Sequence, residues 1–87
     1  MIVINGEIWR ILLVSPNHPQ LRRTDGSLTI GTCNTWLKTI YISNELSHDF
    51  TENVLAHELT HAVLYSYNRK FSSDEEELIA QIVANTK

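Results

Sequence analysis

The segment His57-Glu58-Leu59-Thr60-His61 constrains this chain more than any other part of it. Residues four positions apart share one face of an α-helix, so a helical segment brings the imidazoles of His57 and His61 together. Two imidazoles one turn apart can hold one metal ion. Glu58 lies beside that face, where its carboxylate can accept a proton from a water on the metal. The segment therefore predicts a helix that carries a metal site.

The residues on both sides of this segment favour a helix over about residues 49–68. The neighbouring apolar residues are good helix formers and recur at helical spacing. Asp49 and Glu52 predict a capping box at the start, and Asn68-Arg69-Lys70 suits the negative end of the helix dipole. An alternative interpretation makes the two histidines hydrogen-bonded residues without a metal. Burying two histidines and a glutamate in an otherwise apolar helix, without a ligand that pairs them, would cost free energy of folding.

Length and charge restrict the class of protein. A chain of 87 residues predicts one domain, residues 1–87, with a modest core. The net charge is −3 and no basic cluster is larger than a pair such as Arg22-Arg23, so we do not expect nucleic acid as the main partner. Cys33 is the single cysteine and favours a reducing cytoplasm. Residues 1–6 are too short an apolar run for a signal peptide or a membrane span.

The first half of the chain reads as strands and the second half as helices. Glu7–Val14 predicts a strand, residues 15–27 a loop, and Ser27–Asn34 with Lys38–Ser43 a hairpin. A second helix is expected over about residues 74–86. The fold class is therefore α+β, with a small antiparallel-rich sheet of about three strands followed by two packed helices.

Two capping boxes are possible at the start of the second helix, Ser73 with Glu76 or Ser72 with Glu75. Along this helix we expect the larger apolar residues to fill the core beside the first helix. These residues are Leu78, Ile79, Ile82 and Val83.

A catalytic zinc usually has three protein ligands, and the second helix offers the third. No histidine follows His61, so the candidates are the acidic residues of the first turn. Most of these suit the helix dipole or a cap. Glu77 instead begins a stripe that continues through Ala80, Gln81 and Ala84, whose small alanines would let the helices approach closely. We favour Glu77 as the third ligand, with Glu76 as the alternative.

The two helical segments carry a resemblance to a known group of proteins. HELTHAVLYSY followed by DEEELIAQIVA resembles the small metallopeptidase-like proteins of bacteriophages and mobile elements, relatives of ImmA/IrrE-type and SprT-like zincins. The resemblance covers residues from about 24 to 84. It implies a minimal zincin-like core, a bound Zn²⁺ and a location in the cytoplasm of a bacterial cell or phage-infected host.

In gluzincins, which have a third ligand of this kind, the glutamate heads an ExxxD pattern whose aspartate supports a ligand histidine. Carried over to this chain, the resemblance implies that Glu77 is the ligand and that Gln81 stands at the supporting position. Gln81 has no charge, so its support would be weaker than that of an aspartate.

The predicted chemistry is hydrolysis of a peptide bond by a metal-activated water, with Glu58 moving the proton. Tyr65 or Tyr67 could assist as a phenol, although each could equally be a packing residue. An extended substrate would pair with an exposed strand edge, either Ser27–Thr35 or Lys38–Ser43. Cys33 lies in that region and reads as a small buried residue.

Two functions from different classes fit these features. The first is a zinc metallopeptidase that cuts a specific protein, and the resemblance points to a transcriptional regulator as that protein. The second is a non-catalytic module that keeps the zincin fold to bind a host or phage regulatory protein. The sequence favours the peptidase because the His57-to-His61 pattern is complete and an acidic helix follows it.

Overall fold

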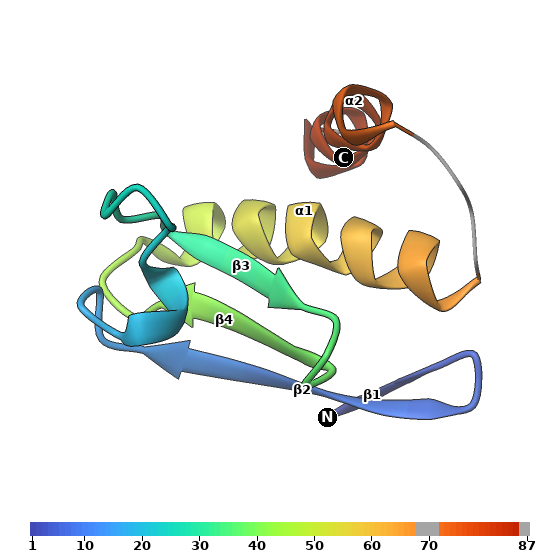
Figure 1. Ribbon diagram of the computed structural model, residues 1–87, viewed down its shortest axis with the longest axis horizontal. Coiled ribbons are helices and arrows are strands. Elements are labelled where there is room, and N and C mark those ends of the chain that lie inside the picture. Colours follow the sequence, from blue (N-terminus) through green and yellow to red (C-terminus); the bar gives the residue numbers. More distant parts are fainter. Residues whose placement is uncertain (68–71, 86–87) are drawn as a thin grey trace.

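A mixed four-stranded sheet carries the two helices on one side (Figure 1). The computed structural model describes residues 1–67 and 72–85. The strands are β1 (Ile2–Ile4), β2 (Glu7–Val14), β3 (Gly31–Asn34) and β4 (Thr39–Ser43), in the spatial order β1-β2-β4-β3. The helices are α1 (His48–Ser66) and α2 (Ser73–Asn85), and a short 3₁₀ helix, η1, spans Pro19–Leu21. The α+β class is confirmed.

The additional strand, β1, forms a hairpin with β2. Asn5 and Gly6 at its turn have φ angles of 49° and 78°, the left-handed conformation that a tight hairpin turn requires. The register pairs Ile2 with Trp9 and Ile4 with Glu7. The expectation of about three strands missed β1, although Asn-Gly is a strong hairpin signal.

The predicted hairpin is formed by β3 and β4, which pair antiparallel, while β4 pairs parallel with β2 on its other side. All five residues of β4 are buried. Ile40 and Ile42 face α1 in the core cluster, and Tyr41 stacks on His18 with ring centroids 5.2 Å apart. Lys38–Ser43 was therefore wrong as a template for an extended substrate, because β4 lies inside the sheet. β3 is the edge strand next to β4, and β1 forms the opposite edge of the sheet.

Helix α1 starts one residue earlier than expected. Ser47 is its N-cap, and the Ser47 hydroxyl accepts a hydrogen bond of 3.2 Å from the backbone N–H of Phe50. The predicted cap at Asp49 with Glu52 was wrong, because both residues already lie inside the helix. The expected cationic end, Asn68-Arg69-Lys70, lies outside the described residues.

Helix α2 starts with the second of the two capping boxes. The backbone N–H of Ser72 donates to Glu75 at 3.1 Å, and the backbone N–H of Glu75 donates to the Ser72 hydroxyl at 3.2 Å. Among the described elements α2 packs on α1 alone, and it buries Ala80 and Ala84 there.

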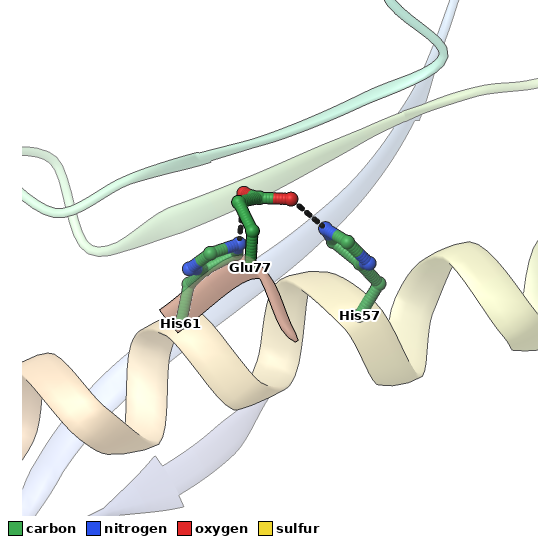
Figure 2. A group of neighbouring side chains, drawn as sticks. All are labelled: His57, His61 and Glu77. Atoms are coloured by element: carbon green, nitrogen blue, oxygen red, sulfur yellow. Dashed lines mark ion pairs between the residues drawn. The ribbon is translucent and has the colours of Figure 1, made fainter. Parts of the chain in front are cut away.

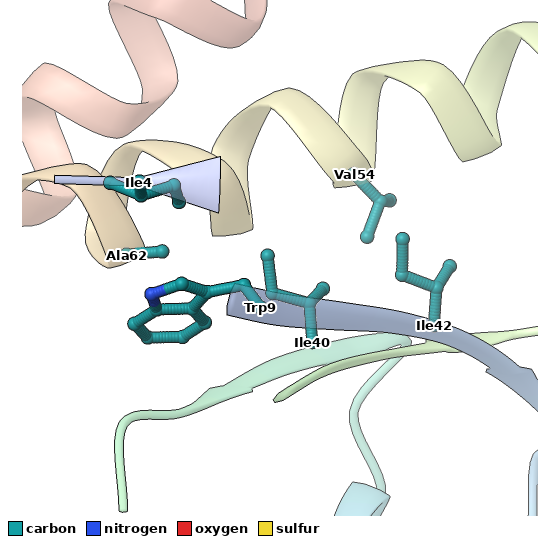
Figure 3. Close-up of a cluster of buried hydrophobic side chains, with 6 residues drawn as sticks. All are labelled: Ile4, Trp9, Ile40, Ile42, Val54 and Ala62. Carbon is teal, nitrogen blue, oxygen red and sulfur yellow. The ribbon is translucent and has the colours of Figure 1, made fainter. Parts of the chain in front are cut away.

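The core lies between α1 and the sheet (Figure 3). Trp9 and Ile40 are fully buried beneath the helix, and Val54 and Ala62 reach down from it. Of the four apolar residues of α2 expected in the core, Ile79 is partly buried, and the expectation for Leu78, Ile82 and Val83 was wrong. Their side chains are exposed, because α2 meets α1 through the face that carries its alanines. Neither described helix has an apolar stretch long enough to cross a membrane.

The start of β3 lies unusually close to α1. A Cβ atom built on Gly31 would stand 2.5 Å from Cγ1 of Val54 and 3.5 Å from Oε2 of Glu58. Only glycine fits there without displacing the buried Val54 side chain. Gly31 therefore sets the distance between the edge strand and the helix that carries the histidines.

We predict that Gly31→Ala lowers the free energy of unfolding by about 1–3 kcal/mol through overpacking against Val54. The double variant Gly31→Ala/Val54→Ala should lose less stability than the two single variants together, because the shorter side chain makes room for the new methyl group. Urea unfolding of the four proteins measures both effects. If the losses in the free energy of unfolding of the two single variants simply add in the double variant, the close packing of Gly31 against Val54 is contradicted.

Candidate metal centre

Three side chains from the two helices converge on one point (Figure 2). Nε2 of His57 lies 3.2 Å from Oε2 of Glu77, and Nε2 of His61 lies 2.9 Å from Oε1 of the same carboxylate. The rings belong to α1 and the carboxylate to α2, so Glu77 spans the gap between the helices. The three donor atoms all lie within 4.8 Å of one another.

The packing of α2 on α1 puts Glu77 in this position. Ala80 and Ala84 are buried against α1, one and two turns beyond Glu77 on the same helix face. Farther along the contact, Nδ2 of Asn53 donates to the backbone carbonyl of Ala84 at 2.8 Å. Side chains as small as alanine allow the helix axes to come close, which brings a glutamate within reach of both rings.

The arrangement fits a tetrahedral zinc ion. With Zn–N and Zn–O bonds of about 2.0–2.2 Å, ligand atoms of a tetrahedral site stand about 3.3–3.5 Å apart. The Nε2-to-oxygen separations of 2.9 and 3.2 Å are a few tenths of an ångström shorter. A small outward movement of the side chains would therefore accommodate the ion. Two imidazoles and one carboxylate are also the donor set of many catalytic zinc sites.

Glu76 contacts the other nitrogen of one ligand ring. Its Oε1 lies 2.7 Å from Nδ1 of His61, while Nε2 of that ring faces Glu77. With a cation at Nε2, the Nδ1–H would donate to Glu76 and hold the ring in the required orientation and tautomer. The sequence left two glutamates as candidates for the third ligand. Glu77 contacts Nε2 of both rings, whereas Glu76 contacts Nδ1 of His61 alone. Gln81, expected in that supporting position, is exposed on α2.

Glu58 is buried between the histidines and the edge strand. Only 9% of its surface is exposed, and its Oε2 faces the Cα of Gly31 in β3. Burial raises the pKa of Glu58, and the neighbouring imidazoles of His57 and His61 oppose that rise. A buried carboxyl with a raised pKa beside a strand edge is suited to accept and return a proton there.

An open cleft of about 1090 Å³ surrounds these residues. The edge strand β3, the loop before it, and both helices line this cleft. Tyr65 lies on its wall, as its spacing from His61 predicts. Tyr67, the other tyrosine considered, follows the last turn of α1 and lines a separate pocket with Asn5 and Lys38.

The single cysteine and the other two histidines do not join the candidate metal centre. Cys33 lines the cleft, but burial and the nearby carboxylates of Glu58 and Glu76 raise the pKa of its thiol to about 12, which keeps it protonated. His48 is exposed at the start of α1, where its Nε2 lies 3.2 Å from Oε1 of Glu52. His18 caps η1 through a hydrogen bond from the backbone N–H of Gln20.

Comparison of this chain with protein-family models, curated proteins and solved structures finds no match. The arrangement of side chains in the cleft is therefore the basis of the functional assignment.

We predict that Glu76→Ala lowers the affinity for zinc about 10- to 100-fold, since it removes the group that orients His61. Glu77→Ala should lower the affinity further because it removes a ligand. Asp74→Asn, an exposed change in the same helical turn, should leave it unaltered. Isothermal titration with zinc, on protein without a histidine tag, measures all three. Equal affinities for wild type and Glu77→Ala would contradict the site.

Proposed function

We propose that this protein is a zinc-dependent peptidase that cuts a peptide bond in a specific protein. One observation carries the proposal: a buried carboxylate, Glu58, lies between three side chains that could hold a metal ion and β3, an edge strand that lines the cleft. A metal site, a proton acceptor and a strand edge for an extended chain are what hydrolysis of a peptide requires. The cleft is open enough for such a chain to enter.

Each residue of the site has one task under this proposal. His57, His61 and Glu77 would hold the zinc ion, and Glu76 would orient His61. When bound, zinc supplies a Lewis acid that polarises the peptide carbonyl and makes a water nucleophilic near neutral pH. Glu58 accepts a proton from the attacking water and returns it to the leaving amine. The main-chain groups of β3 align the substrate by adding it as a further strand.

The phenol of Tyr65 is the group on the cleft wall that could donate a hydrogen bond to the developing oxyanion. Its ring also lies 5.8 Å from Nζ of Lys38, measured to the ring centroid. Both tyrosines line the second pocket at the end of α1, but Tyr67 does not line the cleft and is therefore not part of the proposed mechanism.

The substrate class follows from the resemblance of the two helical segments to phage and mobile-element metallopeptidases. We propose a transcriptional regulator as the protein that is cut, and the cytoplasm of a bacterial cell or phage-infected host as the place of action. The unpaired Cys33 agrees with a reducing compartment.

We predict that Glu58→Gln keeps zinc affinity within about threefold of wild type but lowers kcat/KM about 100- to 10,000-fold, because the amide cannot take the proton. Glu45→Gln, an exposed change on the loop before α1, serves as the matched control. Zinc-loaded proteins are incubated with a peptide library, and products are quantified by mass spectrometry.

Undiminished cleavage by the Glu58→Gln variant would contradict the proposed role of Glu58. If neither protein cuts any peptide, and both bind the same partner protein equally well, the fold serves as a binding module instead.

A further inference from the structure

Two arginines lie at one end of the cleft, and the chemistry described above does not use them. Arg22 and Arg23 belong to the loop between η1 and β3, and both line the same cleft as the histidines. Both are exposed, and no ion pair within the described residues holds either guanidinium. This end of the cleft is therefore positively charged, although the protein has a net charge of −3 and the proposed metal site contains carboxylates.

The loop that carries the arginines is held in place by its own backbone. Arg22 forms a β-bridge with Leu28, and the backbone N–H of Arg23 donates to Ser27 at 2.8 Å. Asp25 accepts hydrogen bonds from the backbone N–H and the hydroxyl of Ser27, at 2.9 and 2.6 Å. Leu21, fully buried, anchors the loop to the sheet. The two guanidiniums are therefore presented by a structured turn, which lowers the entropy lost on binding a ligand.

The arginines lie toward the start of α1, on one side of the metal site. Gly31 lies against Val54 and Glu58 of α1, and the chain that precedes Gly31 runs toward the first turns of this helix. Figure 1 shows the loop at that end of β3. Phe50, on the cleft wall there, stands about 10 Å along the helix from His57, at 1.5 Å per residue. An extended chain covers that distance in about three residues.

The electrostatics of the site agree with this placement. Arg23 is close enough to Glu58 to lower the pKa of that carboxyl, in opposition to the effect of burial. Asp25, the acidic neighbour in the loop, accepts two hydrogen bonds from Ser27 through Oδ1, and the charge of Arg23 helps to lower the pKa of this carboxyl. No side-chain hydrogen bond or ion pair within the described residues uses the donors of either guanidinium, and paired guanidiniums recognise carboxylates through charge-assisted hydrogen bonds.

The apolar residues beside the arginines complete a subsite. Ile30 and Phe50 both line the cleft at this end, with 41% and 47% of their surfaces exposed. They offer an apolar wall for the stem of an acidic side chain or for its apolar neighbour. We infer that Arg22 and Arg23 select peptides with an aspartate or glutamate about two to four residues from the cut bond, on the side toward the start of α1. This inference rests on the proposed peptidase function.

The test uses matched peptides that carry Asp, Asn or Lys at each position flanking the cut bond. The zinc-loaded wild type should cleave the Asp peptide about tenfold or more faster than the Asn peptide at one of these positions, judged by kcat/KM. The charge reversal Arg22→Glu/Arg23→Glu should abolish that preference and favour Lys. The neutral variant Arg22→Gln/Arg23→Gln should show no preference. Arg10→Glu, on β2 and outside the cleft, is the matched control and should behave as wild type.

A binding arm separates this inference from the proposed function. The same peptides are titrated into the zinc-loaded Glu58→Gln protein, with or without the arginine substitutions, and followed by fluorescence anisotropy. If the Asp peptide binds preferentially and this preference depends on the arginines, the inference is supported. If the wild type at the same time cuts no peptide, only the proposed peptidase activity is contradicted. Cleavage without an acidic preference, or a preference that survives the charge reversal, overturns the inference and leaves the peptidase intact. Absence of both cleavage and binding overturns both.

Discussion

The carboxylate of Glu77 reaches from α2 to two imidazoles on α1, and this contact joins the two helices at the candidate metal centre. Burial alone holds α2 weakly, because its buried residues are Ala80 and Ala84, and a methyl group contributes only about 0.8 kcal/mol. The larger side chains of α2, such as Leu78, remain exposed. Polar contacts from Glu76 and Glu77 to the histidines, and from Asn53 to the backbone of Ala84, add to the attachment. A zinc ion shared between the helices would strengthen it, so metal binding and the docking of α2 are expected to be coupled.

The sheet supplies the other half of the proposed site. β4 is buried at its centre and forms a rigid base for α1, while β3 at the edge keeps one side open. Gly31 allows that edge to approach Glu58 without a side chain between them. Glu58, the proposed proton acceptor, thus lies between the proposed metal site and the strand along which a substrate would extend. A chain of 87 residues can build such a cleft because one strand, one loop and two helices each form a wall of it.

Local rules were sufficient to predict both helices, three of the four strands and the pair of histidines. Spacing of four residues places His57 and His61 on one helix face wherever the helix packs, and the hairpin before it follows from alternation and turn residues. Contacts between elements were harder to predict. Helical periodicity groups Leu78 with Ile82 and Ala80 with Ala84, but it does not say which group meets α1. The contact between Nδ1 of His61 and the carboxylate of Glu76 likewise depends on the rotation of α2, which only the tertiary structure defines.

The most direct test of this account is a crystal structure of the protein grown with zinc, with anomalous data collected at the zinc absorption edge. The account predicts one strong peak about 2.0–2.2 Å from Nε2 of His57, Nε2 of His61 and a carboxylate oxygen of Glu77. An empty position there, with the three side chains turned away from one another or the metal bound elsewhere, would contradict it.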